Sequence, residues 1–194
     1  MQYTEGQIGR IFVVRIDDGE DLLASLHRFI VDKGIEAGSV VFLGALMDAK
    51  LVTGPEKPVI PPDPHVVFFE GGWEVFGIGT IFPGDGGPTI HCHASVGRAG
   101  HALTGCLRER AVTYLIVEVV IYEITGLSAR REFDQRMQIH LPVLKDITTK
   151  DPGQATLPGE EGEPVSSGEK NNEGSELPGG LAEIIRDLTK KPPV

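Results

Sequence analysis

The chain has 194 residues, a length that suggests one domain or one domain with an appendage. Hydrophobic residues make up 40% of it and charged residues 24%, and no stretch approaches the roughly 18 uninterrupted apolar residues of a membrane-spanning helix. The 18 basic and 28 acidic residues give a formal net charge of −10. This balance argues against nucleic acid as the main partner, because phosphate binding depends on Lys and Arg.

Cysteine content and the N-terminus both indicate a cytoplasmic protein. Two cysteines, Cys92 and Cys106, are too few for a disulfide framework. The first ten residues, MQYTEGQIGR, lack the basic start and apolar core of a signal peptide. We therefore expect a reducing environment and no membrane association.

The first predicted elements are a strand and a helix. Residues 9–16 are rich in β-forming side chains. Turn and N-cap residues follow at 17–21, and an apolar helical face then repeats up to a natural stop at Gly34. This face is made by Leu22, Leu23, Leu26, Phe29 and Ile30.

The rest of the body reads as strands separated by turns. A proline-rich loop is expected at 53–64. The predicted strands are residues 39–46 with an extension to 52, 65–69, 73–82, 89–96, 101–107, 113–124 and 137–141. About seven strands and one long helix predict an α+β fold with a mainly antiparallel sheet. We assign this domain to residues 5–146.

The chain changes character after the body. Residues 150–194 contain no aromatic residue but 7 Gly and 6 Pro, so we interpret 147–175 as a disordered linker, with an ordered loop as the alternative. Residues 176–191 carry an apolar stripe at helical spacing and predict an amphipathic helix. Such a short helix needs a surface, which its own domain, a neighbouring subunit or a protein partner would supply.

A histidine cluster is the most informative feature of the sequence. His91 and His93 are two residues apart, so on a strand they point to the same face, and Cys92 points away. A chain reversal centred on Gly97 would pair His93 with His101. Three imidazoles would then be close enough for one ion, which is the ligand set of a catalytic zinc site. Nickel, cobalt, iron or copper would also accept imidazole.

Other interpretations of these residues stay open. An HxH pair arises by chance, and a one-residue register slip would send His101 to the other face. Chemistry would also need a carboxylate, for which Glu70 and Glu118 are the candidates. Both are equally compatible with solvent exposure, and Arg15 is a candidate partner for either of them, acting outside the direct ligand shell.

The order of these features resembles the PPC domain (plants-and-prokaryotes conserved domain) in its stand-alone prokaryotic form. The resemblance covers roughly 5–146 and includes none of the tail. It is carried by Gly9-Arg10, Gly19-Glu20-Asp21, Gly34 to Gly38, Leu43 to Leu46, Glu70, His91-Cys92-His93, Gly100-His101 and Gly105.

The resemblance implies an antiparallel sheet packed on a helix, a homotrimer, and a fold similar to that of acetolactate decarboxylase, whose zinc is held by histidines. It also implies that His91, His93 and His101 are metal ligands. Plant members carry Arg-Gly-Arg hooks that enter the DNA minor groove, and this sequence has no such hook.

Three function classes follow from these observations. The first is a trimeric metal-binding protein, with zinc-dependent chemistry on a small carbonyl or ester substrate as an activity that the site would support. The second is a protein-interaction scaffold, and the third is the DNA-associated regulator that the naming of the family suggests.

Overall fold

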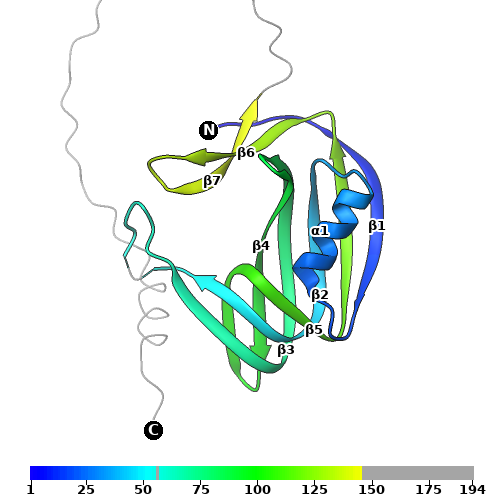
Figure 1. The fold of residues 1–194 in the computed structure, drawn as a ribbon, viewed down its shortest axis with the longest axis vertical. Coiled ribbons are helices and arrows are strands. Elements are labelled where there is room, and N and C mark those ends of the chain that lie inside the picture. Colours follow the sequence, from blue (N-terminus) through cyan, green and yellow to red (C-terminus); the bar gives the residue numbers. More distant parts are fainter. Residues whose placement is uncertain (56, 146–194) are drawn as a thin grey trace, which may run out of the picture. The chain divides into compact units, whose positions relative to one another are not determined.

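The computed structural model describes residues 1–55 and 57–145. This part is mostly antiparallel β-structure with one helix (Figure 1). The elements in chain order are β1 (Gln7–Asp17), α1 (Leu22–Asp32), β2 (Gly38–Thr53), β3 (His65–Gly84), β4 (Gly87–Arg98), β5 (His101–Thr125), β6 (Ser128–Asp134) and β7 (Ile139–Lys145).

The helix begins where the sequence predicts but is short. Asp21 caps it, because the Asp21 side chain accepts a hydrogen bond from the backbone N–H of Ala24 at 2.8 Å. The helix then runs for 11 residues and ends just before Gly34. The expectation of a long helix was therefore wrong, because the predicted apolar face fills only three turns before the Gly34 stop.

Five strands form a sheet that closes on itself. The strand order is β1-β5-β2-β3-β4, and an additional pairing joins β4 to the first part of β5. Figure 1 shows these strands curving around one interior, and α1 packs against β4 and β5. The interior is filled by buried apolar side chains from the sheet and the helix, among them Leu22, Leu26, Ile30, Val40, Phe42, Leu46, Val96, Val119 and Ile121.

Two pairs of predicted strands are continuous in the structure. The segments predicted at 65–69 and 73–82 are both part of β3, and those at 101–107 and 113–124 are both part of β5. The shift at Leu46/Asp48 in the pairing of β2 with β3 accommodates the residues between the first two segments, and the shift at Ala49/Lys50 in the pairing of β2 with β5 accommodates those between the other two. Gly71 and Glu109 have positive φ at these bulges, 86° and 62°, so the alternation of side chains breaks there while each strand continues on both sides.

A second small sheet consists of β6 and β7. Strand β6, with the sequence SARREFD, was not predicted because it is rich in charge. One of its charged side chains, Arg131, is nevertheless buried, with 5% of its surface exposed. The predicted strand at 137–141 corresponds to β7.

The predicted linker at 147–175 and the predicted helix at 176–191 lie outside the described residues. Among the residues that are described, no helix combines the length and the apolar character needed to cross a membrane.

Candidate metal centre

The hairpin of β4 and β5 decides which side chains meet. Ala99 and Gly100 both have positive φ, 49° and 82°, and form a two-residue turn between Arg98 and His101, which pair with each other. The reversal is thus centred between 99 and 100 and not on Gly97. The expected pairing of His93 with His101 is therefore wrong, and His93 lies opposite Cys106.

His101 lies at the turn end of this hairpin. It is exposed and is the first residue of β5. Along this strand it lies five residues before Cys106, the residue opposite His93. At the usual rise per residue this corresponds to about 16 Å along the strand. An odd number of residues also places the His101 side chain on the opposite face of the sheet. The hairpin therefore does not bring His101 to the HxH pair within one chain.

Cys106 takes the position that the sequence assigned to His101. The potential ligand atoms of His91, His93 and Cys106 all lie within 4.8 Å of one another. The two imidazole rings are 5.1 Å apart between centroids, at 84° to each other. Ligand atoms bound to one tetrahedral zinc ion are about 3.3–3.6 Å apart, given ordinary Zn–N and Zn–S bonds. Small side-chain rotations would thus let these three residues hold one ion.

The protonation state of His91 suits a metal ligand. Burial lowers the pKa of His91 to about 4, and the positive charges of Arg131 and Arg108 contribute to the shift. His91 is consequently neutral at pH 7, as a metal-binding imidazole must be. Burial raises the pKa of the Cys106 thiol, so the free protein holds this side chain protonated at pH 7.

The second cysteine belongs to the core. Cys92 is 2% exposed and packs in the hydrophobic interior, as expected for the residue between the two histidines. Its burial raises the pKa of its thiol to about 12. An inert buried thiol at position 92 and a thiol facing two imidazoles at position 106 make the two cysteines a natural pair for comparison.

The candidate carboxylates lie elsewhere on the outer surface. Glu70 is exposed on β3, eight residues from Ile78, which pairs with His93. Glu118 is exposed on β5 directly opposite Arg15, whose guanidinium forms an ion pair with Asp17 at 2.7 Å. The described part of the chain places neither glutamate in the metal cluster. Their catalytic roles and the supporting role of Arg15 stay predictions.

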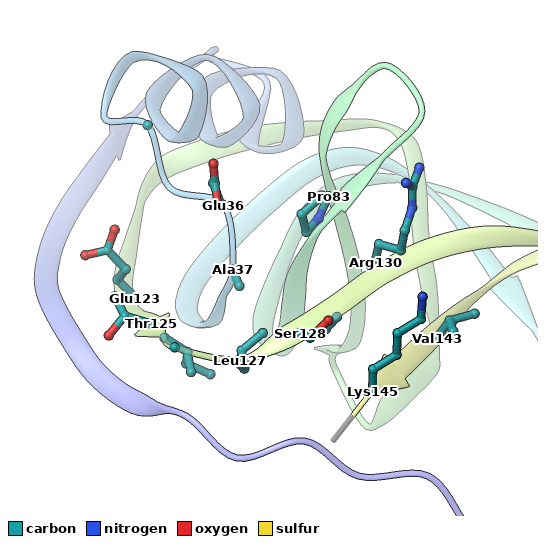
Figure 2. Close-up of a pocket in the computed structure, with 14 residues that line it drawn as sticks. Glu36, Ala37, Pro83, Glu123, Thr125, Leu127, Ser128, Arg130, Val143 and Lys145 are labelled. Atoms are coloured by element: carbon teal, nitrogen blue, oxygen red, sulfur yellow. The ribbon is translucent and has the colours of Figure 1, made fainter. Parts of the chain in front are cut away.

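A cavity of about 400 Å³ lies between the segment that joins α1 to β2, the end of β5 and the β6–β7 sheet. Figure 2 shows Glu36 and Glu123 on one side of it and Arg130 and Lys145 on the other. Glu123 is already held by Arg10, at 2.6 Å between the guanidinium and the carboxylate. This cavity has no histidine or cysteine in its lining and is distinct from the metal cluster.

A different cavity adjoins the cluster. Its volume is about 540 Å³, and His91 and Arg108 form part of its wall together with residues of β6 and β7. The cluster therefore has a space beside it that a small molecule could occupy.

Comparison with known proteins supports this description of the fold. A family model described as the Plants and Prokaryotes Conserved (PCC) domain matches residues 3–125. A search of curated proteins found no match.

Several solved structures are similar to the described fold. A metal-containing protein from Archaeoglobus fulgidus is 24% identical, with a TM-score of 0.66 over 74% of this chain and 99% of its own. A plant- and prokaryote-conserved (PPC) protein from Pyrococcus horikoshii is 26% identical, with a TM-score of 0.63 over 73% of this chain and 96% of its own. A protein from Bacteroides thetaiotaomicron with a suggested DNA-binding role is 21% identical, with a TM-score of 0.60 over 72% and 97%.

Proposed function

Since this chain belongs to the Plants and Prokaryotes Conserved (PCC) domain family, we propose that it is a metal-binding protein with His91, His93 and Cys106 as its ligands. The observation that carries the proposal is the convergence of two imidazoles and one thiol from the paired strands β4 and β5. One fold neighbour is described as metal-containing, which supports the same assignment. Cys106 replaces His101 as the third ligand in this proposal.

The ligand set favours zinc, with nickel or cobalt as alternatives. Imidazole and thiolate are both preferred ligands of these ions, and a His₂Cys set leaves one position of a tetrahedral ion for water or substrate. The ion would polarise a carbonyl group, or activate a water molecule, bound at this open coordination position. Zinc-dependent action on a small carbonyl or ester substrate is the activity that we infer from this. The expected likeness to acetolactate decarboxylase stays a prediction.

A homotrimer remains part of the proposal. Apolar side chains are exposed side by side on the outer face of the sheet, where Leu43 lies opposite Phe76 and Val41 lies opposite Ile78. Leu43, Phe76 and Ile78 each expose more than half of their surface. A contiguous apolar patch on a soluble domain is typical of an interface, and a second copy of the chain is the partner that the family resemblance implies.

DNA binding is the weaker candidate. Fold neighbours are associated with it, but the net charge of −10 and the absence of an Arg-Gly-Arg hook argue against it in this chain. A DNA affinity that falls steeply with salt would favour this alternative.

Metal analysis of protein purified without a His-tag tests the metal site. We expect one equivalent of a divalent ion per chain, with loss of metal in His93→Ala and in Cys106→Ala. His101→Ala and Cys92→Ala are the matched controls, one imidazole and one thiol from the same hairpin, and both should keep the ion. Protein that takes up no Zn²⁺, or a His101→Ala variant that alone loses the ion, would contradict the proposal.

Substitution by cobalt gives a second readout. A cobalt–thiolate bond produces an absorption band that imidazole ligands alone do not, so Co²⁺-loaded protein should show the band and its Cys106→Ala variant should not. Assays on 2-keto and ester substrates, with a chelator-treated control, test the catalytic part. Metal-loaded protein without turnover on either class would reject the enzyme and keep the metal site.

The oligomer is tested by light scattering after size exclusion. Phe76→Glu introduces a charge into the apolar patch and should reduce the mass to that of one chain. Val31→Glu, an equally apolar and exposed position on α1, should leave the mass unchanged. A single-chain mass for the unaltered protein would refute the trimer.

A further inference from the structure

Strand β6 places a buried arginine in the wall of the cavity beside the metal cluster. Arg131 is 5% exposed and lines this cavity of about 540 Å³ together with His91 and Arg108. Strand β6 lies beyond the part of the chain that the family model matches, which ends at residue 125. Its residues therefore lie outside the segment that the family model matches.

The contacts of Arg131 leave part of its guanidinium unused. Its Nη2 donates to Thr80 Oγ1 at 2.9 Å, and its guanidinium lies 5.8 Å from the centroid of the Phe82 ring. Its Nε is buried and has no hydrogen-bond partner among the described residues. A buried N–H without an acceptor is destabilising, so this region of the protein has polar capacity that its own residues do not satisfy.

No acid in the described part of the chain neutralises this region. Arg108 contributes a second positive charge and lowers the pKa of Arg131, although burial is the larger cause of that shift. Neither arginine forms an ion pair with a carboxylate of the described residues. Asp85 lines the same cavity but pairs with Arg130, at 3.1 Å.

We propose that this cavity binds a small organic carboxylate, held by the guanidinium groups of Arg131 and Arg108. The planar fork of arginine matches the two oxygens of a carboxylate, and both arginines line the cavity. Ile90, Ile139 and Leu141 add apolar side chains to the lining, which suits a ligand with a carbon skeleton better than a free phosphate.

The position of His91 extends the inference to the substrate class. His91 belongs both to the lining of this cavity and to the metal cluster, so a carboxylate ligand held by the arginines would bring its next polar group to the ion. A 2-keto acid has a carbonyl oxygen in that place. This second step rests on the proposed metal site, whereas carboxylate binding by the arginines does not.

Isothermal titration with 2-oxobutyrate tests the carboxylate site. The chelator-treated protein, free of metal, should bind this acid, and Arg108→Gln and Arg131→Lys should each weaken binding at least tenfold. Arg98→Gln, at the far end of the same hairpin, should bind like the unaltered protein. The exposed position of Arg108 makes its variant informative even when a variant at the buried Arg131 fails to fold.

Two comparisons separate this inference from the proposed function. Zn²⁺ should tighten 2-oxobutyrate binding several-fold in the unaltered protein and not in His93→Ala; equal affinity with and without Zn²⁺ would overturn the metal contact. Metal-free protein that binds the acid through the arginines but takes up no Zn²⁺ would keep the carboxylate site and refute the metal centre.

The remaining outcomes overturn the carboxylate site itself. If the histidines and Cys106 take up metal but neither arginine substitution changes the affinity for 2-oxobutyrate, the metal centre stands and the carboxylate site is refuted. Inorganic phosphate that binds more tightly than 2-oxobutyrate would refute the assignment to a carboxylate.

Discussion

His93 and Cys106 lie directly opposite each other on the antiparallel strands β4 and β5. Directly opposite residues project to one face with their Cβ atoms about 5 Å apart, so this pairing turns an HxH motif into a three-residue cluster. The two-residue turn at Ala99 and Gly100 sets the register that produces it.

The turn should control both stability and metal binding. Gly100 has a φ of 82°, which a β-branched residue adopts only with strain, so Gly100→Val should lower the free energy of unfolding by about 1–2 kcal/mol. Metal affinity should fall with it, because the register of the hairpin becomes less well defined. Urea unfolding and metal titration measure the two effects. Gly54→Val is the control, since Gly54 has neither a positive φ nor atoms within contact distance, and it should change neither quantity.

Acid should destabilise the protein through Glu123. Three hydrogen bonds from Arg10 lower the pKa of this carboxyl to about 2, from an ordinary value of 4.5. A folded-state pKa below that of the unfolded chain stabilises the protein above pH 4.5, and this contribution is lost as the pH falls from 4.5 toward 2.

Unfolding by urea at several pH values between 2 and 6 tests this dependence. Glu123→Gln cannot ionise, so it should remove the part of the pH dependence of the free energy of unfolding that comes from Glu123. Arg10→Met should reduce this part, because it removes the main cause of the lowered pKa. If the free energy of unfolding depends on pH in the same way in all three proteins, other carboxylates govern acid unfolding.

Asp21 should contribute to stability through two separate contacts. Its Oδ1 accepts from the backbone N–H of Ala24, and its Oδ2 accepts from that of Ala111, which is completely buried on β5. Asp21→Ala should therefore lower the free energy of unfolding by more than the loss of an ordinary helix cap does. We expect about 2–3 kcal/mol for the cap and the buried N–H together. Asp21→Asn should keep the cap and cost less. Thermal or urea unfolding of both variants measures the difference, and equal losses would show that only one contact matters.

The close approach of Gly77 and Phe42 should make position 77 intolerant of a side chain. A Cβ at Gly77 would collide with the ring of Phe42, which is 1% exposed in the core. Gly77→Ala should destabilise the protein by about 1–3 kcal/mol, as overpacking does. Phe42→Leu in the same chain should recover part of the loss, so the two substitutions should be non-additive in urea unfolding. Additive losses would locate the strain elsewhere.

The sequence alone was sufficient to predict the family, the short-range elements and two of the proposed metal ligands. Alternation of side chains placed His91 and His93 on one face, and Asp21 and Gly34 marked the ends of α1. These features depend on neighbours within a few residues, where steric and capping preferences act directly.

The proposed third ligand and the proposed carboxylate pocket both depend on tertiary structure. Moving the centre of one turn from Gly97 to the Ala99–Gly100 step exchanges His101 for Cys106, and no local pattern distinguishes the two. The sequence pattern around Arg131 indicates an exposed charge in a polar segment. In the structure, the packing of β6 beside β3 buries Arg131 next to Arg108. Hairpin register and the burial of a charge both depend on contacts between distant segments, so the sequence alone indicated a metal site and the fold determined which atoms would form it.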